Sequence, residues 1–411
     1  MVLVVVRNNQ VFFQGYGETA PHSHRLPGSD AEVRLCSLTK IFTTDLLTKL
    51  VDDKTVSLND PLQRFAPPMF KVPGNNGVIT LEDLATHTAG LPREIGYPQD
   101  GTAFTFPDYT QRWEWLPKQH PRWQPGTAAH YSNVGYDLLS DGLASAAHKP
   151  FATLLSERTL QPLKMFQTTY YPNPEECSRL LVAARYGSPC TVTEATSGSS
   201  GLYSTPSDMA QWLQYLLNSQ PAAAKAIYLR PDQVKHQQGM NHAGNPSGLG
   251  LGWVHLNDPN DPSHLIQKTG GGAGFLTYIV IHPASHTALF LAATEGPRPA
   301  HSYNLFKNAN NLILQLAGLP PMPEDEEEAK SGRAPTRSGR YALEHGSARA
   351  TTAAPPRHPA GKTARSQARI LAKPAAKPAP KAVHGKASSH AGKAKSNLPA
   401  AHKHPGGKGN K

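Results

Sequence analysis

The sequence predicts an α/β fold in which an antiparallel β-sheet is flanked by helices and interrupted by a mainly helical insertion. Three observations support this prediction. Strand-like apolar runs occur near both ends of the first 320 or so residues. Apolar residues recur at helical spacing through the middle of the chain. The remainder, from about residue 321, repeats Ala, Lys and Pro and cannot build a hydrophobic core.

The first strands are predicted within residues 2–17, as two runs joined by a turn. Each run is apolar at nearly every position, which predicts strands covered on both faces. The stretch is short and has no basic segment before it, so it indicates a β-hairpin rather than a signal peptide. The sequence also contains no window of 18 apolar residues, which excludes a transmembrane helix.

Helices are predicted from periodicity and from start signals. Residues 38–53 are apolar at helical spacing, and Thr80 with Asp83 forms a capping box that starts a short helix. Residues 92–130 are rich in Pro, Gly and aromatic residues, which predicts long ordered loops. Further helices are expected over 133–147 and 206–218.

After residue 248 the character of the sequence changes to strands: LGLGWVHL, HLIQK, FLTYIVIH and TALFLAAT, followed by an amphipathic helix over 303–317. We therefore assign residues 1–62 and 195–320 to the sheet region and residues 63–194 to a mainly helical insert of the same domain. Residues 321–411 are predicted to be a disordered basic tail.

Charge is distributed unevenly between the body and the tail. From Ala329 to the end there are 18 Lys and Arg against one acid, Glu344, which gives this stretch a charge of +17. The whole chain carries +11, so the other 328 residues carry 11 − 17 = −6. Such a tail is either solvated polymer or an electrostatic contact to an anionic surface, such as cell-wall polymer, a membrane surface or nucleic acid.

Three cysteines are present. Cys177 and Cys190 lie in one stretch that contains Pro and Ser, and they would leave Cys36 unpaired. The spacing permits a disulfide in an oxidising compartment but fits three reduced thiols equally well.

Three short motifs follow one another along the chain: Ser37-Leu38-Thr39-Lys40, Tyr131-Ser132-Asn133 and Lys268-Thr269-Gly270. The first and third occur once each. Tyr-x-Asn also occurs at Tyr171, but that copy lies among prolines, whereas Tyr131 lies between a Pro-Gly turn and a helix start.

The first motif has the chemistry of a nucleophile beside its base. A serine hydroxyl is a weak nucleophile and needs a neighbouring base. On a helix, residues three apart share a face, so Lys40 is expected beside Ser37. At a helix N-terminus the backbone N–H of Ser37 can also bind an oxyanion. The apolar rest of the helix is expected to anchor both groups in the core.

The third motif is expected to line the same site. Lys268 is predicted to precede a strand, and the glycines after it let a substrate backbone approach closely. The backbone N–H of Gly271 is the candidate second oxyanion donor. Tyr131 is a candidate general acid or base if nearby cations lower its pKa.

The three motifs together resemble those of the penicillin-recognising serine hydrolases, in the class C β-lactamase-like branch with Tyr-x-Asn as its middle motif. The stretches ITLEDLATHTAGLP, PGTAAHYSNVGYDLL, GLYSTPSDMAQW and IQKTGGGAGF also fit this branch. Within the branch, SLTKIFTTDLLTKLVDDKTVSLNDPL and LATHTAGLPRE are most similar to the D-alanyl-D-alanine carboxypeptidase/endopeptidases. The resemblance covers roughly residues 2–318.

The resemblance implies the β-lactamase/transpeptidase-like fold and a periplasmic enzyme that acts on D-Ala-containing peptidoglycan peptides. Ser37 would be acylated, and Lys40 and Tyr131 would move protons, with the base left open between them. Asn133 would position the substrate, and Lys268, Thr269 and Gly270 would bind it. A Cys177–Cys190 disulfide, penicillin binding with weak or no β-lactam hydrolysis, and the absence of a cofactor are further implications.

The sequence departs from the family at both ends. Family members carry a signal sequence and a helical segment before the first strand, so we expect a misassigned or truncated start. The basic tail lies outside the family pattern. No obligate protein partner is predicted.

Other functions also fit these motifs or this fold. A class C-type β-lactamase, an esterase or a D-amino-acid amidase would use the same motifs, and a catalytically silent anchored binding module would use the fold alone. His282 and His286 lie at a predicted turn and lack a third ligand at a metal-site spacing, so no metal is expected. Trp113, Trp115 and Trp123 are predicted to pack under loops, and His87 is expected to be structural.

Overall fold

The computed structural model describes residues 1–95, 106–184, 188–233, 237–296 and 302–322, all of which belong to one compact unit. Apart from its first two residues, the predicted tail at 321–411 lies outside the described residues.

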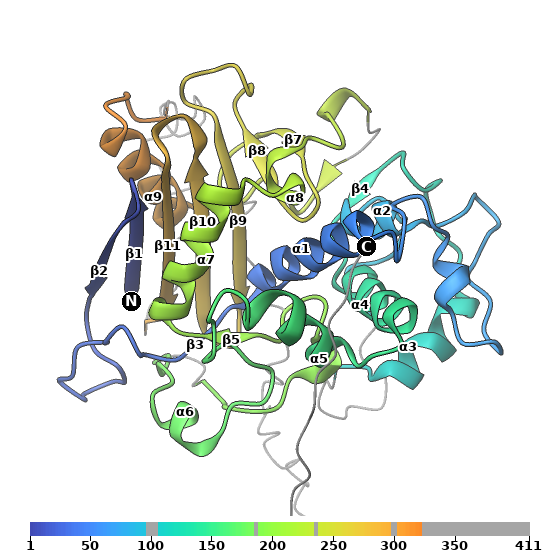
Figure 1. Cartoon of the computed structure of the whole chain (residues 1–411), viewed down its shortest axis with the longest axis horizontal. Coiled ribbons are helices and arrows are strands. Elements are labelled where there is room, and N and C mark those ends of the chain that lie inside the picture. The colour runs from blue at the N-terminus through green and yellow to red at the C-terminus, as the bar shows by residue number, and fades with distance from the viewer. Residues whose placement is uncertain (96–105, 185–187, 234–236, 297–301, 323–411) are drawn as a thin grey trace, which may run out of the picture. The chain divides into compact units, whose positions relative to one another are not determined.

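The unit is built on a seven-stranded antiparallel sheet with the strand order β2-β1-β11-β10-β9-β8-β7 (Figure 1). The strands are β1 (Val2–Arg7), β2 (Gln10–Gly15), β7 (Pro246–Leu249), β8 (Val254–Leu256), β9 (Leu265–Gly272), β10 (Phe275–His282) and β11 (Thr287–Thr294). Pairing of β1 with β11, from Val2↔Ala292 to Arg7↔Thr287, joins the two ends of the domain. The predicted sheet is confirmed.

Two helices cover opposite faces of this sheet. The helix α7 (Pro206–Ser219) packs on β1 and β11, and α9 (Ser302–Leu316) packs on β10 and β11 (Figure 1). Residues along β1 alternate between two hydrophobic cores: Val2 and Val4 join the core with α7, whereas Val5 joins the core with α9. Because successive side chains of a strand point to opposite faces, β1 is buried on both, as predicted.

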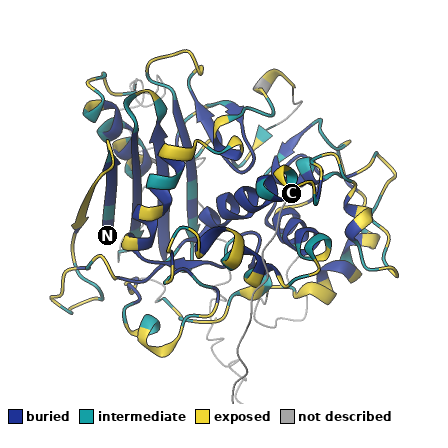
Figure 2. Ribbon diagram, in the orientation of Figure 1, coloured by how far each residue is buried: buried dark blue, intermediate teal, exposed yellow. Residues whose placement is uncertain are grey.

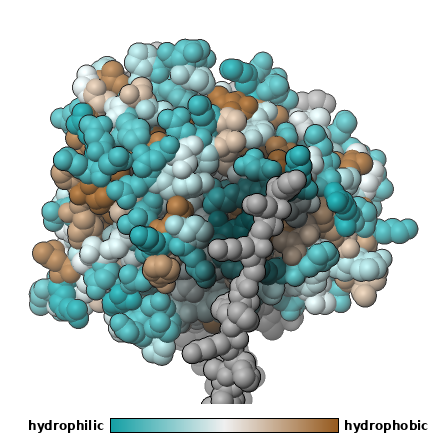
Figure 3. Space-filling view, viewed as in Figure 1, coloured by the Kyte–Doolittle hydropathy of each residue, from teal (hydrophilic) through white to brown (hydrophobic). Residues whose placement is uncertain are grey.

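The prediction that β2 is covered on both faces is wrong. Val11, Phe12 and Phe13 are 46%, 56% and 37% exposed, and β2 appears as an exposed strand in Figure 2. It is the edge strand, and the helices lie over the inner strands, so nothing within the described residues covers it. Hydrophobic residues accordingly gather at the left of the surface in Figure 3, over β1 and β2.

The helix α1 (Thr39–Asp52) runs from the sheet into the helical region (Figure 1). It is preceded by a 3-10 turn at Cys36–Leu38, so the predicted helix over 38–53 is correct to within a residue at each end. It packs against α4 (Asn133–Ala147), α5 (Phe151–Leu155) and α8 (Ala222–Lys225), and is therefore buried on most sides, polar residues included.

The insert predicted at 63–194 contains α2 (Leu81–Ala85), α3 (Tyr109–Trp115), α4, α5, α6 (Pro174–Ser178) and the short strand β4 (Ala129–His130). The predicted capping box of Thr80 and Asp83 starts α2. The prediction of loops alone over 92–130 is wrong, because Asp108 and Gln111 form a second capping box that starts α3. Residues 96–105 of that stretch are outside the described residues.

Two small two-stranded sheets lie outside the seven-stranded sheet. The strand β3 (Val33–Arg34) pairs antiparallel with β5 (Tyr203–Ser204), just before the 3-10 turn that carries Ser37. The strand β4 pairs in parallel with β6 (Gln237–Gln238), next to Tyr131. Both small sheets therefore lie beside residues of the predicted site.

A disulfide joins Cys177 and Cys190, whose Cα atoms are 5.7 Å apart. We expect this bond in protein exported through an oxidising compartment, with Cys36 remaining a free thiol. Cys36 is buried, and burial raises its pKa to about 11, which keeps it protonated and unreactive. Non-reducing peptide mapping checks both statements, and free thiols at Cys177 and Cys190 in exported protein would contradict the first.

Candidate active site

Ser37 lies in the 3-10 turn that leads directly into α1, and its side chain is almost buried. The residue before it, Cys36, has φ of 51°, a left-handed conformation that is uncommon for a residue with a side chain. The thiol of Cys36 faces the carbonyl of Gly272 on β9 at 3.4 Å. The backbone is thus held in a sharp turn at the candidate nucleophile.

Lys40 follows one turn later and is fully buried. Its Nζ lies 3.4 Å from Ser37 Oγ, 2.6 Å from Asn133 Oδ1 and 2.8 Å from the Ser199 carbonyl. The structure therefore brings together three of the predicted site residues, Ser37, Lys40 and Asn133. Ser199, which the sequence did not single out, completes the set.

Burial lowers the pKa of Lys40 to about 7, since an ammonium group loses its hydration there. The opposing influence comes from two carboxylates, Asp137 and Glu94, whose negative charge favours the protonated amine. Within the described residues, neither forms an ion pair with Lys40 at 4 Å or less. Lys40 can therefore change its protonation state near neutral pH.

Tyr131 lies beside this lysine, with three cations close to its ring. Lys40 Nζ is 4.8 Å, Lys268 Nζ 5.0 Å and the Arg93 guanidinium 5.0 Å from the ring centre. The backbone of Tyr131 is fixed by its N–H, which donates to the carbonyl of Gln238 in β6. The predicted residue Tyr131 thus lies between the two predicted lysines.

Lys268, Thr269, Gly270 and Gly271 lie within β9, which continues beyond the predicted strand HLIQK as far as Gly272. They pair with β10 on one side, whereas the partner strand β8 reaches only as far as Gln267 on the other. The strand continues because Phe275 to Tyr278 on β10 extend the ladder past the lysine as far as Gly272. Burial lowers the pKa of Lys268 to about 8.

Gly270 lets β9 lie against the turn that carries Ser37. A Cβ at this position would lie 2.2 Å from Thr277 Oγ1, 2.9 Å from the Leu35 carbonyl and 3.2 Å from the Ser37 backbone nitrogen. Any other residue would push the strand away from the candidate nucleophile.

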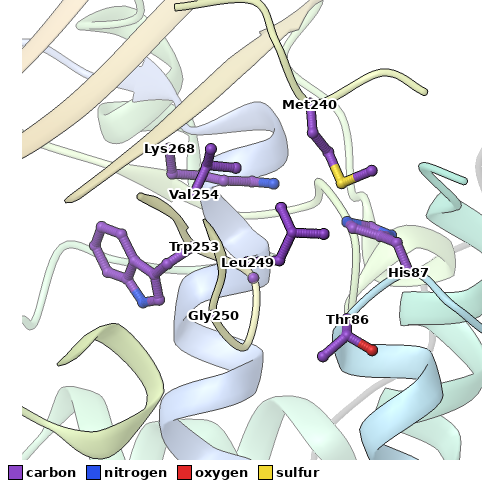
Figure 4. A pocket seen from close by; sticks show the side chains of 9 residues that line it. Thr86, His87, Met240, Leu249, Gly250, Trp253, Val254 and Lys268 are labelled. Atoms are coloured by element: carbon purple, nitrogen blue, oxygen red, sulfur yellow. The ribbon is translucent and has the colours of Figure 1, made fainter. Parts of the chain in front are cut away.

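His87 is placed as a structural residue. Its Nδ1 accepts from the Ser132 backbone N–H at 3.1 Å, and its carbonyl accepts from the His130 N–H. Burial lowers the pKa of His87 most, and the positive charge of Lys268 lowers it further. The pKa therefore lies well below its ordinary value, and the ring is neutral. His87 and Lys268 face a small cavity of about 10 Å³ from opposite sides, with Met240, Leu249 and Trp253 (Figure 4). This is about the volume that one water molecule needs.

The remaining predicted residues lie away from the site. Trp113 is fully buried and Trp115 packs against the core, so both pack as predicted, although they lie on α3 and not in a loop. His282 ends β10 and His286 follows the turn at Pro283–Ser285. Within the described ranges there is no group of three or more His, Cys, Asp or Glu side chains arranged to hold a metal ion.

Sequence reasoning missed Glu94, Asp137 and Ser199. Glu94 accepts from Asn133 Nδ2, and Asp137 accepts from the Ser199 backbone N–H at 3.0 Å. The one available signal was that Asp137 follows Asn133 by four residues and so shares its helix face.

The chain is similar in sequence to several known proteins. The chain is 42% identical over 337 residues to the D-alanyl-D-alanine-carboxypeptidase/endopeptidase AmpH of Escherichia coli K12, covering 78% of this chain and 86% of that protein. It is 24% identical over 306 residues to Protein flp of Staphylococcus aureus MRSA252, with 71% of this chain and 58% of that protein covered.

Among solved structures, a beta-lactamase/D-alanine carboxypeptidase from Yersinia pestis, complexed with citrate, is 40% identical. It matches with a TM-score of 0.72 over 77% of this chain and 92% of its own. A class C beta lactamase from Rhodobacter sphaeroides has the same fold at 19% identity, with a TM-score of 0.62 over 77% of this chain and 94% of its own.

The sequence profile of the beta-lactamase family matches residues 1–309, which include all three motifs. With the seven-stranded sheet, the 3-10 turn and α1 helix that carry Ser37 and Lys40, and relatives at 40% and 42% identity, this chain belongs to the beta-lactamase family.

Proposed function

We propose that this protein is a serine hydrolase that cleaves D-Ala-containing peptidoglycan peptides, as a D-alanyl-D-alanine carboxypeptidase and endopeptidase. The observation that carries the proposal is the contact of Ser37 Oγ with Lys40 Nζ, in a chain 42% identical to a carboxypeptidase/endopeptidase. A class C-type β-lactamase is the alternative within the family, and the more similar relatives favour the peptidase.

Hydrogen-bond accounting supports Lys40 as the base for Ser37. A neutral amine has two N–H groups and one lone pair. Asn133 Oδ1 and the Ser199 carbonyl can only accept, so they take the two hydrogens. In the structure Lys40 Nζ donates to Ser37 Oγ at 3.4 Å. In the neutral amine that position is left to the lone pair, to which the Ser37 hydroxyl can donate. This arrangement prepares Ser37 to lose its proton to Lys40 as it attacks.

The reaction then follows in balanced steps. Ser37 Oγ bonds to the carbonyl carbon of the D-Ala residue while its proton moves to Lys40. The backbone N–H groups of Ser37 and Gly271 stabilise the oxyanion. The scissile C–N bond breaks, the leaving amine takes a proton through Tyr131, and an acyl-enzyme remains. Water attacks the ester, its proton returns through the same groups, and the acid product leaves Ser37 free.

Digestion of purified muropeptides tests this function. The wild type is expected to release D-Ala from pentapeptides and to split D-Ala-linked dimers, as followed by chromatography with mass spectrometry. A wild type that hydrolyses penicillins rapidly and leaves these peptides intact would instead support the β-lactamase alternative.

Lys268 is proposed to bind the terminal carboxylate of the substrate, with Thr269 beside it. Lys268→Ala is therefore expected to weaken cleavage of peptides that end in a free carboxylate much more than cleavage of a matched ester, because only the former carries the charge. Steady-state kinetics on the two substrates measures the difference. Equal losses on both would show that Lys268 acts on another group, such as Tyr131.

We further propose a periplasmic location and an adhesive role for the tail. Within the described residues no helix is both long and apolar enough to cross a membrane.

Truncation after residue 321 should keep turnover of a small soluble peptide within a few-fold, because the three motifs lie before it. It should also remove binding to anionic sacculi, anionic vesicles or nucleic acid, since the stretch from Ala329 with its charge of +17 is lost, together with the five acidic residues at 324–328.

Pelleting and filter-binding assays at increasing salt test the tail. Binding should weaken as the Debye length falls from about 10 Å at 0.1 M to about 3 Å at 1 M. Adhesion that survives truncation and high salt would belong to the folded body, and loss of peptide turnover on truncation would contradict the proposed role.

A further inference from the structure

Two carboxylates, the half-buried Glu94 and the buried Asp137, lie near Lys40 without forming an ion pair with it. Glu94 follows α2 in the chain, and Asp137 lies one turn beyond Asn133 on α4. Each bonds to a group that Lys40 itself contacts: Glu94 accepts from Asn133 Nδ2, and Asp137 accepts from the Ser199 N–H at 3.0 Å. Both acceptors of the lysine are therefore held from behind by a carboxylate.

On the basis of the proposed function, we propose that Glu94 and Asp137 are positioning residues. They fix Asn133 Oδ1 and the Ser199 carbonyl, the two acceptors of Lys40, so that the lone pair of the neutral amine points at Ser37 Oγ.

The Asn133 amide shows why such a residue is needed. A flipped amide would turn its NH₂ group towards Lys40, and two donors would then face each other. Glu94, as a carboxylate, can only accept, so it selects the orientation in which Nδ2 faces Glu94 and Oδ1 faces Lys40. A single side chain thereby decides whether Lys40 has its first acceptor.

Asp137 acts in the same way on the turn that contains Ser199. The turn is packed tightly on α4, since a Cβ at Gly198 would lie 2.0 Å from the Tyr136 carbonyl. Thr43 on α1 donates to the Gly198 carbonyl at 2.8 Å. The bond from Ser199 N–H to Asp137 completes this fixation, and the Ser199 carbonyl is left directed at Lys40.

The distance of the carboxylates from Lys40 is also important. A carboxylate in direct contact would hold the lysine in its protonated form, in which it cannot accept a proton. The two carboxyl groups lie behind a neutral amide and a backbone N–H, where they orient the amine without forming an ion pair with it. Burial raises the pKa of both groups, that of Asp137 to about 7. The charged and titratable groups that face Lys40 are Asp137, Glu94, Arg93, Cys36, Tyr131, Tyr136, His87 and Lys268.

The test separates orientation from charge. Glu94→Gln and Asp137→Asn keep an oxygen acceptor but remove the negative charge, whereas Glu94→Ala and Asp137→Ala remove both. Acylation by a fluorescent penicillin is measured by stopped flow from pH 5 to pH 9. The acid limb of the pH–rate profile is the range in which the rate falls because Lys40 becomes protonated. Since both carboxylates raise the pKa of Lys40, each amide variant is expected to move this limb to lower pH. Its plateau rate should stay within a few-fold, while the alanine variants lose roughly a hundredfold across the range.

Asp141→Asn is the matched control. Asp141 lies on the same helix, is equally buried and pairs with Arg112 at 2.8 Å, away from both acceptors of Lys40. It is expected to lower thermal stability without moving the acid limb. The proposal is overturned if the alanine variants acylate like the wild type, or if neither amide variant shifts the limb. A wild type that is not acylated would instead refute the proposed function.

Discussion

Ser37→Ala is expected to abolish covalent labelling by a fluorescent penicillin. The hydroxyl of Ser37 is the group placed 3.4 Å from Lys40 Nζ, and alanine leaves no atom there that can form an acyl bond. Gel fluorescence and intact-protein mass spectrometry measure the label, and muropeptide cleavage should be lost in parallel.

Ser207→Ala provides the control, because Ser207 is an exposed serine near the start of α7 that bonds to the Ser29 carbonyl. It should be labelled like the wild type. Equal labelling of Ser37→Ala and the wild type would remove Ser37 from the mechanism and, with it, the proposed reaction.

Lys40→Ala is expected to lower the acylation rate at least about a hundredfold, the usual scale of general acid–base catalysis. Tyr131→Phe should have a loss of similar size if the phenol passes the proton to the leaving amine. In the wild type, acylation should rise with pH through about 7, because Lys40 accepts a proton only when neutral and burial places its pKa there. Stopped-flow acylation from pH 5 to pH 9 measures both effects.

Lys49→Ala is the matched control on the same helix. Lys49 pairs with Asp45 at 2.7 Å and is partly exposed, so its loss should leave acylation unchanged. If Lys40→Ala kept the wild-type rate and pH profile, Tyr131 would be the base, and the lone-pair argument would be wrong.

The elements of this fold could be predicted where local pattern decides them. The helix over 133–147 is found at those residues, and the Thr80–Asp83 capping box starts α2, because periodicity and end signals are properties of neighbouring residues. The burial of β2 could not be predicted. Its apolar sequence fits an inner strand, and only the position of α7 and α9 over other strands leaves it exposed.

The sequence by itself determined the family, because the three motifs can be recognised in order along the chain. It also placed Lys40 beside Ser37, because residues three apart on a helical turn share a face. Only the tertiary structure decided what surrounds them. Asn133 and Ser199 come from distant parts of the chain and meet at Lys40 because α4 packs against α1 and the Gly198 turn packs on α4. Glu94 lies behind Asn133 and bonds to its amide. Burial by that packing removes water from the lysine, and this desolvation, which no local pattern records, brings its pKa to about 7.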